Sequence, residues 1–226
     1  MNKNLTYAAI AGAVVVAGFG AWQMGVFGRS DSLLAGVASG QTVEIKDSDM
    51  VHGSKDAPVT MVEYASMTCP HCAAFQKEVI PLLNKDYVET GKVKVVFREY
   101  PLDGAARMAS AVARCFKGDQ YFSFIDLLFA NQANWIKDFD GNQQLTREDI
   151  LEGLSQMARQ AGMPREKVES CAEDKDNLAL VDGNWMEGQN RYSVNSTPTF
   201  LINGVAHAGE IPYEQLKGIL DPLVKK

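Results

Sequence analysis

The sequence predicts an α/β fold around a mixed β-sheet, with a block of helices inserted between its two halves. Residues 59–64 and 92–100 are strand-like apolar runs separated by a helical segment, a pattern typical of two parallel strands joined by a right-handed crossover. Residues 199–202 and 205–207 form two more apolar runs around an Asn-Gly turn, the strongest short signal for a β-hairpin. Between these pairs, from residue 103 to residue 192, apolar side chains recur with helical spacing.

The helical segments complete each half of the predicted fold. A helix over residues 73–79 makes the first half β-α-β, and a helix over residues 213–224 makes the second half β-β-α. Within the insertion, Thr146 begins a capping-box-like helix start, and Gly162 with Pro164 ends that helix. The Met and Phe stripes of these helices are expected to form core rather than a cofactor site.

Two cysteines, Cys69 and Cys72, lie on the turn between the first strand and its helix. A Cys-x-x-Cys in this position is the sequence mark of thioredoxin-like redox sites. Pro70 suits the first helical turn, so Cys69 is expected at the helix N-terminus, where free N–H groups and the helix dipole favour a thiolate. His71 is expected to add a donor or a positive charge beside that sulfur. We therefore predict that Cys69 is the more exposed nucleophile and Cys72 the leaving thiolate of an exchange reaction.

The same pair of cysteines has two other interpretations. It could be half of a zinc site, which would need two further ligands at matching spacing, but no such ligands are present and we predict no metal. It could also be an inert structural disulfide. The strand-to-helix setting favours redox chemistry over both alternatives.

Two motifs together indicate a family. Cys69-Pro70-His71-Cys72 with Ser196-Thr197-Pro198-Thr199-Phe200 resembles the DsbA family of thiol:disulfide oxidoreductases, over roughly residues 60–224. The resemblance implies a thioredoxin fold, with β-α-β and β-β-α halves around a central mixed sheet and a helical insertion at about residues 103–192. It also implies the strongly oxidising disulfide for which that family is known.

The resemblance assigns roles to three further residues. Thr197 and Pro198 resemble the cis-proline loop that faces the redox pair and offers strand-like hydrogen bonds to a substrate peptide; a trans proline at the start of an edge strand is the alternative. Glu63 matches a buried acid that relays the proton of the inner thiol. The alternative for Glu63 is a solvent-facing strand residue, and Lys92 is a candidate partner for it. The predicted site residues are thus Cys69, Pro70, His71, Cys72, Thr197, Pro198 and Glu63.

Cys115 and Cys171 complete an even cysteine count. In an exported protein an even count favours a structural disulfide between them, which would stabilise the fold by roughly 4 kcal/mol on the chain-entropy model. Two separate buried thiols are the alternative.

The N-terminus indicates export. Residues 5–28 carry no charged side chain and are long enough to cross a bilayer, which takes roughly 20 residues. We predict a membrane anchor at residues 1–29, with a cleaved signal as the alternative. Residues 30–54 are predicted to be a linker with one short strand at residues 43–45, and residues 55–224 a single DsbA-like thioredoxin domain. The expected location is the periplasm, attached to the inner membrane.

Charge and motifs together bound the function. The net charge of −6 disfavours nucleic acid as a partner, because binding phosphates needs a basic surface. No cofactor is predicted. The first hypothesis is an exported oxidase that donates its disulfide to reduced or unfolded exported proteins and is reoxidised by a membrane partner. Thr197 before the proline resembles the disulfide isomerases of the superfamily, so an isomerase or reductase is the second hypothesis. A client-binding chaperone without redox turnover is the third.

Overall fold

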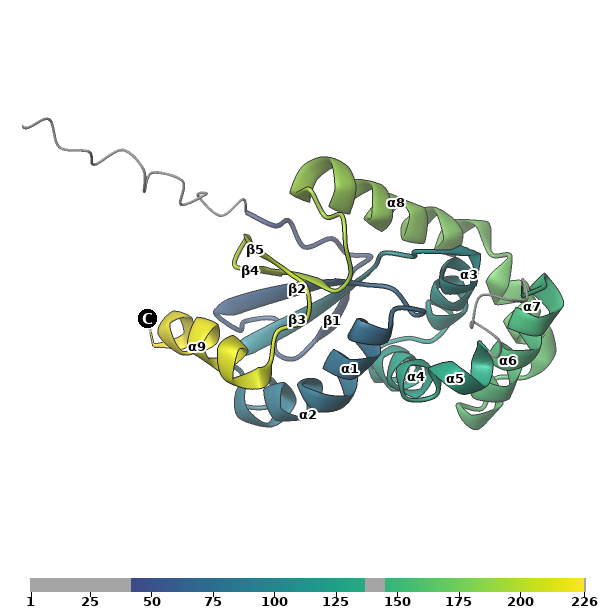
Figure 1. Ribbon diagram of the computed structural model, residues 1–226, viewed down its shortest axis with the longest axis horizontal. Helices are drawn as coiled ribbons and strands as arrows, with labels where there is room; N and C mark the ends of the chain where they lie inside the picture. The colour runs from purple at the N-terminus through teal and green to yellow at the C-terminus, as the bar shows by residue number, and fades with distance from the viewer. Residues whose placement is uncertain (1–41, 137–144, 226) are drawn as a thin grey trace, which may run out of the picture. The chain divides into compact units, whose positions relative to one another are not determined.

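The computed structural model describes residues 42–136 and 145–225, which contain a five-stranded mixed sheet in the order β1-β3-β2-β4-β5 (Figure 1). β2 and β3 are parallel, and the other neighbouring strands are antiparallel. The parallel β-α-β unit and the C-terminal β-β-α unit predicted from the sequence are therefore confirmed. The strands are β1 (Met50–His52), β2 (Val59–Ala65), β3 (Val93–Glu99), β4 (Thr199–Ile202) and β5 (Val205–Ala208).

The helices follow the predicted order. Two helical segments separate β2 from β3, continued by one π-helical turn, η1, and a helical insertion lies between β3 and β4. The predicted capping box of the insertion is present, since Thr146 and Asp149 exchange side-chain-to-backbone hydrogen bonds. The helical elements are α1 (Pro70–Glu78), α2 (Ile80–Leu83), η1 (Asn84–Val88), α3 (Gly104–Ala113), α4 (Asp119–Ala130), α5 (Gln132–Trp135), α6 (Arg147–Gln160), α7 (Arg165–Ala172), α8 (Lys175–Tyr192) and α9 (Tyr213–Val224).

Helices cover both faces of the sheet, because the central strand β2 carries apolar side chains on each face. Met61 of β2 packs with residues of α1, α2, η1 and α9, whereas Val62 and Tyr64 pack with Tyr192 at the end of α8. Side chains alternate along a strand, so Glu63 lies on the same face as Met61, towards α1. This alternation places a carboxyl group under the start of the redox helix.

The C-terminal hairpin turns at the predicted Asn-Gly pair. Asn203 and Gly204 both have positive φ, 45° and 83°, as a two-residue type I′ turn requires. The turn is fastened to β2, because the backbone N–H of Asn203 donates to the carbonyl of Thr60 and the Asn203 side chain accepts from the Thr60 N–H, each at 2.9 Å.

The predicted linker boundary and the predicted strand at residues 43–45 are wrong. Residues 43–45 have no strand structure, and the strand of this region is β1, inside the predicted linker of residues 30–54. The reason is that β1 already occupies the edge of β3, while the carbonyl of Glu44 accepts a hydrogen bond from Arg98 instead of a strand partner. Three residues at a sheet edge give too short a pattern for the sequence to show.

A buried ion pair fixes this N-terminal segment to the domain. The guanidinium of Arg98 donates to both carboxylate oxygens of Asp49, at 3.0 and 2.8 Å, and both side chains are fully buried. Arg98 also donates to Tyr64 and Glu187, and Lys46 pairs with Glu187 at 2.7 Å. Removing one partner of such a pair would leave a buried charge uncompensated. The segment from Glu44 onward is therefore part of the domain.

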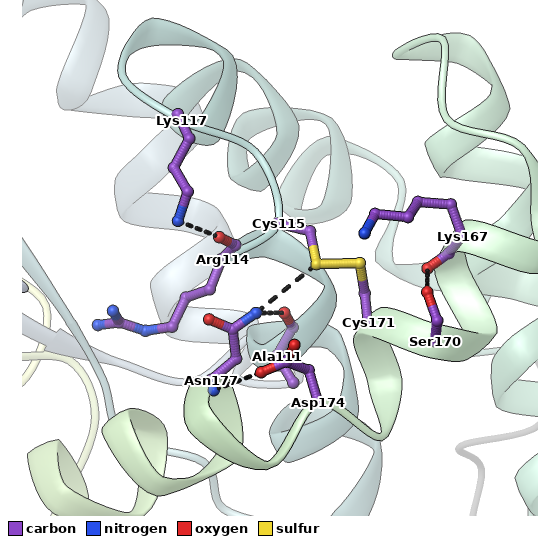
Figure 2. The surroundings of a disulfide bond; sticks show 9 residues. All are labelled: Ala111, Arg114, Cys115, Lys117, Lys167, Ser170, Cys171, Asp174 and Asn177. Atoms are coloured by element: carbon purple, nitrogen blue, oxygen red, sulfur yellow. Dashed lines mark hydrogen bonds between the residues drawn. A yellow bond between two sulfur atoms is a disulfide. The ribbon is translucent and has the colours of Figure 1, made fainter.

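The insertion has its own disulfide. Cys115, just after α3, is bonded to Cys171 in α7, 56 residues further along the chain (Figure 2). The side-chain amide of Asn177, in α8, donates to Cys115 Sγ at 3.6 Å and to the carbonyl of Ala111 (Figure 2). Three helices of the insertion are thus joined at this point.

The predicted anchor at residues 1–29 lies outside the described residues. Within residues 42–136 and 145–225, no helix combines the length and the apolar character needed to cross a membrane.

Candidate active site

Cys69 is the N-cap residue of α1, as the sequence predicts. Its backbone is extended, Pro70 occupies the first helical turn, and its sulfur accepts a hydrogen bond from the backbone N–H of Cys72 at 3.4 Å. The first turn of a helix has N–H groups without helical partners, and here one of them points at the sulfur. Cys69 therefore lies where a thiolate is stabilised by the helix itself.

The two thiols have opposite acidities. A hydrogen bond from the Cys72 thiol, with backbone N–H groups of Cys72 and His71, lowers the pKa of Cys69 to about 5 despite its burial. Burial raises the pKa of Cys72 far above its usual range, and the nearby Cys69 and Glu63 add to this effect. At neutral pH the reduced pair therefore carries its negative charge on Cys69.

Cys69 is much less exposed than we expected. Its exposed fraction is only 3%, against 0% for Cys72, so both free cysteines are buried. The surrounding loops cover it: its thiol donates to the backbone carbonyl of Thr197 at 3.4 Å. A reacting partner must therefore approach Cys69 past the Thr197 loop.

The imidazole ring of His71 pairs with a carboxylate from the other end of the chain. The imidazole Nδ1 lies 3.2 Å from a carboxylate oxygen of Glu210, and the side chain is largely exposed. What His71 contributes to the Cys69 thiolate is its backbone N–H. Sequence patterns did not identify Glu210, which lies 139 residues from its partner.

The Thr197–Pro198 peptide bond is cis, and its loop faces the redox pair. The loop is held in place by β4 and β5, since the Pro198 carbonyl accepts from the Gly209 N–H and the Ser196 carbonyl accepts from the Thr199 hydroxyl, each at 2.8 Å. The Thr197 hydroxyl is buried and makes no hydrogen bond to the described residues. The structure thus brings Thr197 and Pro198 to Cys69, 128 residues away in sequence.

Glu63 is buried below the cysteines, so the solvent-facing alternative is wrong. Its exposed fraction is 1%, and its Oε1 has no hydrogen-bond partner among the described residues. Burial, with the nearby charges of Asp126 and Cys69, raises the pKa of Glu63 to about 8. Glu63 can therefore exchange a proton near neutral pH. The proposed partner Lys92 is wrong, because its ammonium group donates to the carbonyl of Asp86.

Residues of the insertion hold the redox loop, and sequence reasoning missed them. The side-chain amide of Gln132 donates to the carbonyls of Met67 and Cys69, at 2.9 and 3.0 Å. The Thr68 hydroxyl donates to Asp103 at 2.7 Å, and Asp103 also caps α3. Both contacts join positions more than thirty residues apart. No local pattern reports such contacts, although Asp103 is a recognisable N-cap residue.

The fold and this pair of unequal thiols define a thioredoxin-like redox protein. A profile of the thioredoxin family matches residues 46–222. The chain belongs to this family and, within it, to the DsbA-like thiol:disulfide oxidoreductases. The match begins at residue 46, in agreement with the packing of the segment before β1.

Three known proteins illustrate the similarity. A protein of Rickettsia bellii, named a protein-disulfide oxidoreductase, is 32% identical over 167 residues, which are 73% of this chain and 60% of the relative. Disulfide bond formation protein D of Bacillus subtilis is 25% identical over 77% of each chain. The crystal structure of alpha-DsbA1 of Wolbachia pipientis is 26% identical with a TM-score of 0.70, and the match covers 80% of this chain and 93% of that one. The chain spans less than two thirds of the length of the Rickettsia relative.

Proposed function

We propose that this protein is an exported thiol:disulfide oxidoreductase that introduces disulfides into folding proteins through Cys69 and Cys72. The observation that carries the proposal is the contrast between the thiols: the pKa of Cys69 is lowered to about 5, and that of Cys72 is raised. A stabilised thiolate favours the reduced form of the couple, so the disulfide is a strong oxidant.

In the proposed reaction, a client thiolate attacks Cys69 Sγ of the oxidised pair. A new disulfide forms between the client and Cys69, and Cys72 leaves with the electron pair and takes a proton. A second client thiolate then attacks the client's own sulfur in this mixed disulfide, closes the client disulfide and releases the Cys69 thiolate. The low pKa of Cys69 makes it a good leaving group in that step.

Thr197 and Pro198 are proposed to position the client. The Thr197 loop covers Cys69, and a client strand lying beside it could form backbone hydrogen bonds next to the reacting sulfur. Glu63 is proposed to supply the proton that Cys72 takes, because its pKa of about 8 keeps it protonated at neutral pH.

The location and partners are proposed from the same hypothesis. Residues 1–29 would anchor the chain to the inner membrane or direct its export, with the catalytic domain in the periplasm. The clients would be reduced exported proteins, and a membrane redox partner would reoxidise Cys69 and Cys72. The domain boundaries we propose are an anchor or signal at residues 1–29, and a redox domain that begins by residue 44 and ends at residue 224.

The test is client trapping in the cell of origin. Cys72→Ser should accumulate mixed disulfides between Cys69 and exported proteins, because its Cys69 thiolate attacks a disulfide of the client, a client thiolate leaves, and no Cys72 thiol is present to attack Cys69 and release the client. Cys69→Ser is the matched control and should trap almost nothing, since the Cys72 thiol is fully buried and poorly acidic. Equal trapping by both variants would show that the nucleophile is misassigned.

An isomerase remains the second candidate because Thr197 precedes the proline. The two functions differ in the redox state that acts on clients: an oxidase reacts from the disulfide, an isomerase from the dithiol. Incubation of the reduced protein with a client whose disulfides are wrongly paired would therefore restore the native pairs only in the second case.

A further inference from the structure

The imidazole of His71 is engaged by Glu210 and not by the redox sulfur. His71 is the second residue after Cys69, in the first turn of α1, and its side chain is 71% exposed. Its Nδ1 lies 3.2 Å from a carboxylate oxygen of Glu210, whereas the side-chain hydrogen bonds of Cys69 join it to Thr197 and Cys72. The backbone N–H of His71, and not its ring, is among the leading groups that lower the pKa of Cys69. The donor or positive charge that an imidazole can offer a thiolate is thus taken up by Glu210.

The fold sets the position of Glu210, which lies in the loop between β5 and α9. The backbone N–H of Gly209 donates to the carbonyl of Pro198 at 2.8 Å, so this loop is joined to the cis-proline loop. Gly209 has a positive φ of 87°, which glycine adopts without strain. On the other side, Ile211 is buried in the apolar cluster that contains Phe75 of α1. The backbone therefore presents the Glu210 carboxylate to the start of α1.

The consequence of this pair lies in its place beside the thiolate. Glu210 is the only carboxylate that pairs with His71 among residues 42–136 and 145–225. The Glu210 side chain is 32% exposed, and an ion pair so open to solvent contributes little to folding stability. A positive charge or a donor next to a thiolate favours its charged form, and any such interaction at Cys69 favours the reduced state of the couple. A group that engages the His71 ring can therefore change the reduction potential.

We propose that Glu210 is a positioning residue that limits the oxidising strength of the Cys69–Cys72 couple by engaging the His71 ring. The inference rests on the proposed function, in which this couple exchanges disulfides with clients. With Glu210 present, the thiolate is stabilised by the Cys72 thiol, by Thr197 and by backbone N–H groups. Without Glu210, the ring is free to turn towards Cys69 and to add its own N–H or charge. The reduced state is then more stable, and the disulfide is a stronger oxidant.

The negative charge of Glu210 could have an effect of its own. A carboxylate near a thiolate disfavours the charged form, so removing Glu210 would stabilise the reduced state even if His71 did not move. The charge of Glu210 is not among the leading influences on the pKa of Cys69. The two explanations differ in whether His71 is required, and the experiment must therefore include variants that lack the imidazole.

The experiment equilibrates the wild type, Glu210→Ala, His71→Ala and the double variant with reduced and oxidised glutathione. In the presence of His71, Glu210→Ala should raise the equilibrium constant for reduction of the Cys69–Cys72 disulfide about two- to fivefold, the range expected for one exposed charged contact. In the His71→Ala background, Glu210→Ala should have almost no effect. Glu214→Ala is the matched control, because it removes an exposed carboxylate in the first turn of α9 that does not pair with His71. This control should keep the wild-type constant.

Two results would overturn the proposal. An unchanged or lower constant in Glu210→Ala would show that the carboxylate does not limit the oxidising strength of the couple. An equal rise with and without His71 would show that Glu210 acts by its own charge and not through the ring.

Thiolate absorbance of the reduced proteins gives a second readout, which a purely structural role of Glu210 would not move. The pKa of Cys69, about 5 in the wild type, should fall in Glu210→Ala and stay in place in Glu214→Ala. The double variant should have the same pKa of Cys69 as His71→Ala alone. A wild-type pKa in Glu210→Ala would contradict the proposal.

Neither readout uses a client protein. A wild-type protein that forms no disulfide in a reduced, unfolded client would refute the proposed function. Normal client oxidation together with an unchanged constant in Glu210→Ala would refute the role of Glu210 alone.

Discussion

Replacing Glu63 with glutamine should stabilise the reduced protein above neutral pH and have little effect in acid. Glutamine keeps the size of the side chain and cannot ionise, so it removes only the cost of a buried carboxylate. The pKa of Glu63 is raised from 4.5 to about 8 in the folded protein. A raised folded pKa means that the folded state holds the proton more tightly, so this contribution to stability is complete below pH 4.5 and is lost as pH rises through about 8.

The size of the effect follows from the two pKa values. A rise from 4.5 to about 8, at 1.36 kcal/mol for each pKa unit, corresponds to roughly 5 kcal/mol in the free energy of unfolding. Cys69 acts in the opposite direction: its lowered pKa of about 5 adds stability as pH rises from there to about 9. The wild-type curve alone can therefore look flat, and the informative quantity is the difference between wild type and Glu63→Gln.

The assay is denaturant unfolding of both reduced proteins at a series of pH values from 4 to 9, a range set by the ordinary and raised pKa of Glu63. The difference should grow in favour of Glu63→Gln between about pH 5 and pH 8 and level off above. Glu78→Gln, at an exposed position of the neighbouring helix, is the control and should show no such trend. A constant difference across the whole range would refute the assignment of Glu63 as a buried acid that titrates near neutral pH.

Three further predictions concern the cysteines and the proline loop. Thiolate absorbance of the reduced protein should appear in one step near pH 5, be abolished by Cys69→Ser and remain in Cys72→Ser; a step near pH 9 would contradict the site geometry. Thr197→Val should shift the reduction potential, because the Thr197 side chain is one of the groups that lower the pKa of Cys69. It should cost little stability, since the buried Thr197 hydroxyl has no close hydrogen-bond partner among the described residues. An unchanged potential would contradict this. Mild reduction followed by thiol labelling should mark Cys69 and spare the Cys115–Cys171 disulfide; equal labelling of all four cysteines would be the contrary result. Replacing both Cys115 and Cys171 with alanine should lower the free energy of unfolding by roughly 4 kcal/mol on the chain-entropy model, given their separation of 56 residues.

The fold could be predicted from the sequence because each of its signals is local. The apolar run of β2, the Asn-Gly turn of the β4–β5 hairpin and the capping box at Thr146 each depend on residues within a few positions of one another. The strand β1 has no such signal, because only three residues pair at the edge of β3. The apolar residues of 43–45 alternate like a strand, yet the structure gives them no strand partner, and the carbonyl of Glu44 accepts from Arg98 instead.

The site could be predicted only in part for the same reason. Cys69 and Pro70 define a helix start by themselves, and the acidity of Cys69 follows from that position. The contacts that adjust the site come from distant elements: Gln132 on the redox loop, Glu210 on His71, and Asp126, whose charge acts on Glu63. Each is a polar residue at an ordinary surface or helix position in the sequence. The packing of the insertion against α1 brings Gln132 and Asp126 to the site, whereas Glu210 reaches it from the loop between β5 and α9.

The reduction potential of the Cys69–Cys72 couple tests the central claim most directly. It can be measured by equilibrating the protein with glutathione buffers and quantifying the two redox states after acid trapping. The lowered pKa of Cys69 and the buried Cys72 predict a strongly oxidising couple, with a reduction potential of about −120 mV. A potential near that of thioredoxin, about −270 mV, would contradict the proposed oxidase and identify the couple as a reductant.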